Sequence, residues 1–345
     1  MTEKIKFTLD GRQVEAQAGE TIWQVAKREG VDIPHLCWRP EPGYRADGNC
    51  RACMVEVEGE RVLTASCQRR ASEGMKVKTA SERAKKSREM VFELLLADQP
   101  ARDDGHDPKS SFWGWVDKMG ISASSRYPAG EKPVADNSHT AIAVNLDACI
   151  NCNLCVRACR EVQMNDVIGM AYRGHGAKVV FDFDDPMGTS TCVACGECVQ
   201  ACPTGALMEA SLIDKATGKR TEYEDKTVDT ICPYCGVGCQ TSVHVKDNRV
   251  LYVDGRNGPA NENRLCVKGR FGFDYIHHPD RLTKPLIRRE GQAKRECLIP
   301  RTRDEIMEVF REATWDEALD MAATSWGPSP SRSSQRSRWA SRSSV

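Results

Sequence analysis

Apolar and polar positions alternate over the first residues of the chain. The apolar positions of this first alternation are Ile5, Phe7 and Leu9. A two-residue period is typical of a strand with one buried face. The Asp10-Gly11 pair that follows is a hairpin turn signal, so the renewed alternation at Val14 and Ala16 predicts a second strand.

A helix is predicted directly after these strands. Thr21 and Gln24 have the spacing of a capping box, in which each side chain satisfies a backbone N–H at the start of the helix. Gly30 can end the helix in the left-handed conformation. The apolar face behind the box consists of Ile22, Val25 and Ala26. Two strands, a helix and a following cysteine loop predict a small domain of the β-grasp type over residues 1–78.

The next segment, residues 79–140, contains no cysteine. Its first part, residues 80–97, is predicted as a helix. The rest is rich in Asp, Pro, Gly and Ser and is predicted as a connector, with a short helix around residues 112–116. The residues expected on one apolar face of the first helix are Val91, Leu94 and Leu95.

The remaining segments are divided by composition. Residues 141–212 hold two groups of cysteines, and residues 228–285 hold another group among short strand-like runs. Residues 286–323 form a separate segment without a cysteine set. Residues 324–345 are dominated by Ser and Arg, have no apolar period and cannot build a core, so a disordered tail is expected.

Charge and hydropathy exclude several classes of protein. Lys plus Arg and Asp plus Glu both number 49, so no global charge indicates binding to nucleic acid or to a membrane surface. No apolar run approaches the roughly 20 residues that span a bilayer. The N-terminus has neither the apolar core of a signal peptide nor a twin-arginine pair. We therefore expect a cytoplasmic protein without a nucleic-acid or membrane partner.

The chain has 17 cysteines, and sixteen of them fall into four closely spaced sets. Structural disulfides are rare in a reducing compartment, and tight pairs and triplets are typical of metal binding. Iron–sulfur clusters and structural zinc are the two alternatives. The unpaired Cys297 is predicted to be a free thiol.

The first set has the spacing Cys-x12-Cys-x2-Cys-x13-Cys and consists of Cys37, Cys50, Cys53 and Cys67. A [2Fe–2S] cluster needs four thiolates on two irons, and a Cys-x2-Cys pair can hold one iron from a single tight loop. Gly48 and Asn49 precede that pair and permit close approach of backbone N–H groups to the sulfides. The set predicts a [2Fe–2S] cluster, with zinc as the alternative.

The two middle sets repeat the run Cys-x2-Cys-x2-Cys-x3-Cys, and Pro203 follows the second run. This is the run of bacterial two-cluster ferredoxins, whose fourth cysteine ligates the other cluster. Arg160 stands where the second run has its proline, which weakens the internal symmetry but not the ligand assignment. The expected [4Fe–4S] sets are Cys149, Cys152, Cys155 with Cys202, and Cys192, Cys195, Cys198 with Cys159.

The last set has the spacing Cys-x2-Cys-x3-Cys-x26-Cys and predicts a third [4Fe–4S] cluster. Its members are Cys232, Cys235, Cys239 and Cys266. With Lys268 two residues after the last cysteine, the set resembles the [4Fe–4S] domain that opens molybdopterin oxidoreductases. The resemblance implies that Lys268 lies between cube and pterin and is a candidate for electron relay.

The first set also resembles a known domain. Its spacing is similar to that of the [2Fe–2S] domain at the N-terminus of complex I large subunits, iron-only hydrogenases and NAD-dependent formate dehydrogenases. Two segments add to this similarity, Gly19-Glu20-Thr21-Ile22 and Ile33-Pro34-His35-Leu36-Cys37. Complex I large subunits lack the middle pair of sets, and iron-only hydrogenases lack the last set.

All four sets together resemble the alpha (catalytic) subunit of cytoplasmic NAD-dependent molybdenum or tungsten formate dehydrogenases, over residues 1 to about 323. The resemblance implies an α+β chain with a β-grasp [2Fe–2S] domain, a bacterial dicluster [4Fe–4S] domain and a small molybdopterin-oxidoreductase [4Fe–4S] domain. It also implies a flavin-containing, NAD-reducing diaphorase-type partner subunit, and a molybdenum or tungsten bis-pterin in the full-length family.

The sequence departs from this family in two places. Residues 68–148 hold no cysteine, so the His-x3-Cys-x2-Cys-x5-Cys cluster of many relatives cannot form, and His106 is expected to be an ordinary surface or packing residue. Residues 310–319 resemble the start of the pterin-binding domain, after which the Ser/Arg-rich tail follows. The expectation is a chain truncated before the catalytic domain, by a short gene or a shifted reading frame, that binds no pterin and only transfers electrons.

Three alternatives to this interpretation stay open. The chain could be a stand-alone multi-cluster electron carrier. It could be a fragment of a related hydrogenase or NADH-quinone oxidoreductase. It could also be a structural zinc-binding module.

Overall fold

The computed structural model describes residues 4–122, 126–128, 130, 132–292 and 302–325. The chain forms two compact units, Met1–Phe273 and Asp274–Val345, which are described separately. The predicted free thiol Cys297 and nearly all of the predicted Ser/Arg tail lie outside the described residues.

The first unit begins with a five-stranded sheet in the order β2-β1-β5-β3-β4. The first two strands form the predicted hairpin, with Phe7 opposite Val14, and β5 pairs with β1 in parallel. Helix α1 (Ile22–Arg28) begins at the predicted capping box of Thr21 and Gln24. The strands are β1 (Lys4–Leu9), β2 (Arg12–Gln17), β3 (Met54–Val57), β4 (Thr64–Ala65) and β5 (Lys76–Lys78).

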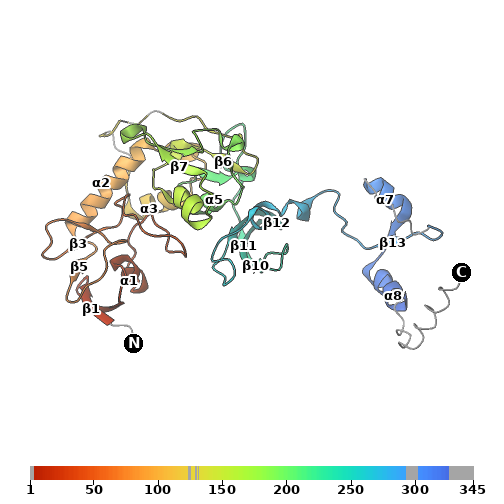
Figure 1. The fold of residues 1–345 in the computed structure, drawn as a ribbon, viewed down its shortest axis with the longest axis horizontal. Helices are drawn as coiled ribbons and strands as arrows, with labels where there is room; N and C mark the ends of the chain where they lie inside the picture. Colours follow the sequence, from red (N-terminus) through yellow and green to blue (C-terminus); the bar gives the residue numbers. More distant parts are fainter. Residues whose placement is uncertain (1–3, 123–125, 129, 131, 293–301, 326–345) are drawn as a thin grey trace, which may run out of the picture. The chain divides into compact units, whose positions relative to one another are not determined.

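The predicted helix after the sheet is α2 (Glu82–Asp98), which runs from the β-grasp strands toward β7 (Figure 1). The face predicted for it is wrong in part, because Leu94 is half exposed. The buried side chains instead repeat every four residues, at Ala84, Arg88, Phe92 and Leu96. Helix α3 (Ser111–Met119) confirms the short helix, and its Phe112 stacks on Phe92 with ring centroids 5.9 Å apart.

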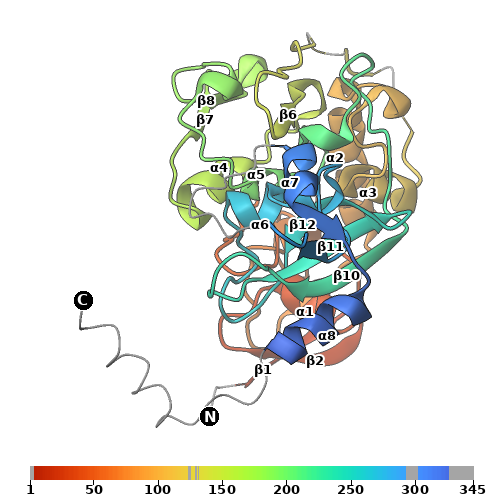
Figure 2. The ribbon, with the colours of Figure 1, turned by 90° about the vertical axis from the view of Figure 1, so that its right-hand side faces the viewer.

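Two short helices and two small two-stranded sheets follow. Strands β6 (Ile142–Val144) and β9 (Leu207–Glu209) are antiparallel, as are β7 (Ile168–Ala171) and β8 (Lys178–Phe181). The helices α4 (Leu154–Arg157) and α5 (Glu197–Ala201) lie close together, with α6 near them (Figure 2). Cys159 lies in a π turn, Ala158–Val162, which extends the first helix. The second helix, α5, instead ends at Ala201, just before Cys202 and Pro203. This difference is the structural consequence of Arg160 in place of proline.

The first unit ends with a three-stranded antiparallel sheet and a short helix. The strands β10 (Lys226–Ile231), β11 (Gln240–Lys246) and β12 (Arg249–Gly255) confirm that this segment contains short strands. Their turn uses Asp247 and Asn248, both with positive φ. Helix α6 (Val267–Phe271) starts directly after Cys266.

The second unit is small. Strand β13 (Leu286–Arg288) pairs with β14 (Phe310–Glu312) in a two-stranded antiparallel sheet. Helix α7 (Arg303–Val309) precedes β14, and helix α8 (Trp315–Ser325) follows it.

Candidate metal centres

The thiols of Cys37, Cys50, Cys53 and Cys67 lie together in the β-grasp domain. Hydrogen bonds from the thiols of Cys50 and Cys67 lower the pKa of Cys37 to about 2, whereas they raise the pKa of the two donors. A hydrogen bond with Cys67 likewise lowers the pKa of Cys53 to about 7. The backbone N–H groups of Asn49 and Cys50 also point at the Cys37 sulfur. The loop that follows Gly48 thus brings two backbone N–H groups to a cysteine sulfur.

The second group joins residues that are distant in sequence. Burial raises the pKa of the thiols of Cys149, Cys152 and Cys155, and the nearby Cys202 raises all three further. Together the four thiols line one small cavity, whose other walls include Pro203 and Val179.

The third group is the reciprocal of the second. Burial raises the pKa of the thiols of Cys192, Cys195 and Cys198, and Cys159 is a neighbour that raises each of them further. The fourth cysteine of each run therefore lies with the first three cysteines of the other run.

The two cysteine loops share a backbone conformation. Asn151 and Ala194 occupy equivalent positions, and both have positive φ, 51° and 54°. This conformation directs the N–H of Asn151 to the Cys149 sulfur at 3.4 Å, and the N–H of Ala194 to the Cys192 sulfur at 3.3 Å. Left-handed backbone is strained for alanine by roughly 1–2 kcal/mol, so the loop geometry is maintained against a local cost. N–H groups of this kind stabilise thiolate ligands.

The fourth group is the most exposed. Cys239 has Cys232, Cys235 and Cys266 as charged neighbours, which raise the pKa of its thiol after the effect of burial. Cys235 and Cys266 are exposed, unlike any member of the other three sets. Lys268 is also exposed, on α6, two residues after Cys266.

The four groups follow one another in space in chain order. The side chain of Asn49, next to the first group, donates to the carbonyl of Cys152 at 3.4 Å. Cys155 of the second group has Cys198 of the third as a neighbour. Helix α6, which follows Cys266, reaches the carbonyl of Cys195 through Arg270 at 2.8 Å.

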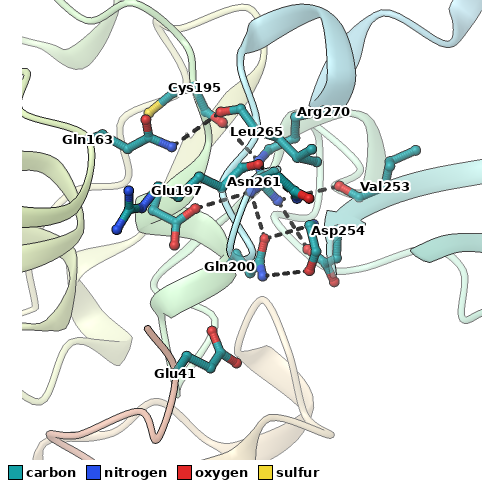
Figure 3. A network of polar contacts seen from close by, with 12 residues as sticks. Glu41, Gln163, Cys195, Glu197, Gln200, Val253, Asp254, Asn261, Leu265 and Arg270 are labelled. Carbon is teal, nitrogen blue, oxygen red and sulfur yellow. Dashed lines mark hydrogen bonds and ion pairs between the residues drawn. The ribbon is translucent and has the colours of Figure 1, made fainter. Parts of the chain in front are cut away.

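Two arginines at these junctions were not singled out as functional by the sequence. Arg157 on α4 is 1% exposed and donates to the carbonyl of Cys37. Arg270 on α6 is 0% exposed and lies in a network with Glu197, Gln200 and Asp254 (Figure 3). The sequence carries no local signal for either arginine, because the cysteine carbonyls that they bind lie far away along the chain.

The donor chemistry fits iron–sulfur clusters. All sixteen cysteines in the described part of the chain are free thiols, gathered in fours and approached by backbone N–H groups. No three Cys, His, Asp or Glu side chains among these residues are close enough to hold a single metal ion directly. Thiolates of a cluster bind separate irons bridged by sulfide, so they need not converge on one point.

Three domain families match successive parts of the chain. A "2Fe-2S iron-sulfur cluster binding domain" matches residues 2–82, a "4Fe-4S dicluster domain" matches residues 148–206, and a "Molybdopterin oxidoreductase Fe4S4 domain" matches residues 225–278. The chain is an iron–sulfur member of the molybdopterin oxidoreductase family. The α+β fold class and the three domain types predicted from the sequence are thereby confirmed.

Similar proteins of this family include several curated oxidoreductases. An NADH-quinone oxidoreductase subunit of Rhizobium meliloti is 34% identical over 83% of this chain and 33% of its own length. "Probable oxidoreductase YjgC" of Bacillus subtilis is 30% identical over 94% of this chain and 35% of its own. A "Putative formate dehydrogenase" of Staphylococcus haemolyticus is 28% identical over 94% and 35%. The chain thus spans about a third of the length of these relatives.

A solved structure extends the comparison. A chain in the "Crystal structure of NAD+-reducing [NiFe]-hydrogenase in the H2-reduced state" is 28% identical, with a TM-score of 0.54 over 64% of this chain and 91% of that chain. No helix in the described ranges is both long and apolar enough to cross a membrane.

His106 is the remaining residue that the sequence left open between surface and packing. It is 1% exposed, and burial lowers the pKa of its imidazole while a backbone hydrogen bond at Gly205 opposes that shift. The packing alternative is therefore the one observed.

Proposed function

We propose that this chain is the electron-relay segment of an NAD-dependent formate dehydrogenase with a molybdenum or tungsten pterin centre. Its four cysteine groups would hold one [2Fe–2S] and three [4Fe–4S] clusters, each of which carries one electron at a time. The observation that carries the proposal is the spatial order of the four groups, which forms a continuous series from Cys37 to Cys266.

The ligand sets are part of this proposal. Each group of four thiols supplies the thiolates that one cluster requires, and the buried groups exclude water from the sulfur atoms. Lys268 is proposed as a relay residue beside the last cluster, next to the pterin centre of the complete enzyme. A cytoplasmic location is also proposed, because the sixteen described cysteines form no disulfides, and structural disulfides are rare in a reducing compartment.

The proposed partner is a flavin-containing subunit that reduces NAD. It is supported by the similarity to a chain of an NAD⁺-reducing hydrogenase and to an NADH-quinone oxidoreductase subunit. The same similarities favour a second candidate function, a relay in a related hydrogenase. The last cysteine set favours the formate dehydrogenase, because it lies in the segment that matches the [4Fe–4S] domain of molybdopterin oxidoreductases.

Iron analysis tests the cluster content. Anaerobically reconstituted chain is expected to bind about 14 irons, two in the [2Fe–2S] cluster and four in each cube. Stoichiometric zinc without iron, in protein purified without air, would refute the proposal and support the structural zinc module.

The choice of reductant tests the enzyme class. The complete enzyme that contains this chain is purified without air and mixed with formate, hydrogen or NADH. Bleaching of the cluster absorption by formate and by NADH is the expected result. Bleaching by hydrogen but not by formate would refute the formate dehydrogenase and support the hydrogenase relay. Bleaching by NADH alone would refute both candidate functions.

A further inference from the structure

Arg157 joins the first cysteine group to the second. Its guanidinium leaves α4, between Cys155 and Cys159, and donates to the carbonyl of Cys37. The same side chain donates to the carbonyl of Arg45 at 2.5 Å and pairs with Asp47 at 3.1 Å. A buried cation is retained only where such partners compensate its lost hydration, so the position of this side chain is strongly determined.

Arg270 joins the third group to the fourth in the same manner. Its Nε donates to the carbonyl of Cys195 at 2.8 Å, from the helix that begins after Cys266. Its Nη atoms reach the Asp254 carboxylate at 3.1 Å and the Gln200 side chain at 2.6 Å. Figure 3 shows these donors spread around a single guanidinium.

The backbone beside Cys195 is shaped for this arginine. A Cβ placed on Gly196 would lie 1.9 Å from the Cδ of Arg270, so no side chain other than glycine's fits there. Gly196 also has a φ of +71°, which glycine adopts without strain. The arginine side chain therefore occupies space that the cysteine loop leaves free for it.

We propose that Arg157 and Arg270 are positioning residues that fix the distance between neighbouring cluster sites. The proposal rests on the relay function above. Each guanidinium binds the main-chain carbonyl of a ligand cysteine in one group from a helix that contains, or directly follows, a cysteine of the next group. Several N–H donors on one rigid plane fix an orientation, which the single ammonium of lysine cannot do. Each arginine also places a buried positive charge beside a site that becomes more negative on reduction.

The test uses the full chain, reconstituted without air, reduced with dithionite and examined by low-temperature EPR. The readouts are the magnetic coupling between neighbouring clusters and the midpoint potential of each cluster. Arg157→Met is expected to lose coupling between the [2Fe–2S] cluster and the Cys149 cube, and to keep coupling between the Cys192 and Cys232 cubes. Arg160→Met is the matched control, because Arg160 is exposed and pairs only with Asp166 in the described part of the chain.

Arg270→Met is expected to lose coupling between the Cys192 and Cys232 cubes and to keep coupling between the [2Fe–2S] cluster and the Cys149 cube. It is also expected to shift the midpoint potential of the Cys192 cube to a lower value. Arg270→Lys is expected to keep the potential and lose the coupling, which separates charge from position. Gly196→Ala is expected to resemble the lysine variant, since it displaces the arginine without removing it. The control is Arg249→Met, which removes an exposed arginine paired with Glu222 in the same domain.

Two results would overturn the proposal. One is wild-type coupling in iron-loaded Arg157→Met or Arg270→Met. The other is wild-type coupling in Arg270→Lys. This second result overturns the proposal even if Arg270→Met fails to bind iron. Failure of the unmodified chain to bind iron would instead refute the relay function itself, so the two failures are distinguishable.

Discussion

At the scale of single residues, the ionisable side chains buried in the first unit differ in how well their charge is compensated by hydrogen-bond partners and opposite charges. Arg157 and Arg270 are buried, and each donates to backbone carbonyl and carboxylate acceptors. Glu209 on β9 is different. Burial raises the pKa of its carboxyl to about 7, and the nearby Asp254 adds to that shift. A carboxyl in this setting is held neutral by the fold until the pH rises.

This carboxyl predicts a pH-dependent stability. The unfolded Glu209 ionises near its ordinary value of 4.5, and the folded one near 7. The folded state therefore binds more protons between these values, so stability falls as pH rises from about 4.5 to 7, by about 3 kcal/mol. Glu209→Gln removes this loss. It should raise the thermal midpoint of the iron-loaded protein at pH 8 and change it little at pH 5.

The exposed Glu89 on α2 provides the control, because Glu89→Gln should have no such pH-dependent effect. An equal gain in thermal midpoint from Glu209→Gln at both pH values would contradict the prediction.

The pairing of Cys202 with the second group predicts a specific cluster loss. Cys202→Ser should damage the cube held by Cys149, Cys152 and Cys155, because those are the thiols it neighbours. The reciprocal variant, Cys159→Ser, should damage the Cys192 cube. EPR of the reduced variants distinguishes the two cubes. Loss of the Cys192 cube in Cys202→Ser would show that the runs do not exchange ligands.

Single residues also mark the limit of sequence inference at this site. The cysteine sets could be predicted because a cluster requires four thiolates from short loops, and that spacing is written locally. Arg157 and Arg270 could not be assigned, because their partners are backbone carbonyls, which every residue possesses. Cys37 lies 120 residues from Arg157, and Cys195 lies 75 residues from Arg270. Only the packed fold brings these groups together.

At the scale of elements, local signals predicted structure wherever the stabilising interaction was itself local. The hairpin of β1 and β2 and the start of α1 follow from a turn pair and a capping box. The buried face of α2 did not follow from its leucines. Arg88 on that face donates to the carbonyls of Met54 at 2.8 Å and Thr79 at 2.6 Å, and these distant acceptors bring a charged residue inward.

The capping box of α1 predicts a measurable loss. The Thr21 side chain accepts from the Gln24 N–H at 3.3 Å, and the Gln24 side chain accepts from the Thr21 N–H at 2.9 Å. Thr21→Ala removes the first of these bonds and should destabilise the β-grasp domain by about 1 kcal/mol. Thermal loss of the [2Fe–2S] absorption should therefore occur at a lower temperature. Thr21→Ser, which keeps the acceptor oxygen, should match the unmodified chain; an equal loss in both variants would exclude the cap as the cause.

At the scale of the whole first unit, the four thiol groups differ in their access to solvent along the series. The first three groups contain only buried or partly buried cysteines, whereas Cys235 and Cys266 of the last group are exposed. Exposed apolar side chains surround the latter, at Tyr234, Val237 and Val267. Solvent access opens bridging sulfides and thiolates to oxidants and shifts cluster potentials.

This gradient predicts the order of cluster loss in air. The cube held by Cys232, Cys235, Cys239 and Cys266 should disappear first, followed later by the buried cubes. Samples of reconstituted chain exposed to air for increasing times are analysed for iron and, after reduction, by EPR. About four of the roughly 14 irons should leave in the first phase. Cys232→Ser, which removes one ligand of this cube, should abolish that phase and leave the later ones unchanged. Early loss of the Cys149 or Cys192 cube would contradict the argument, because it would mean that burial of the thiols does not decide how oxygen reaches the clusters.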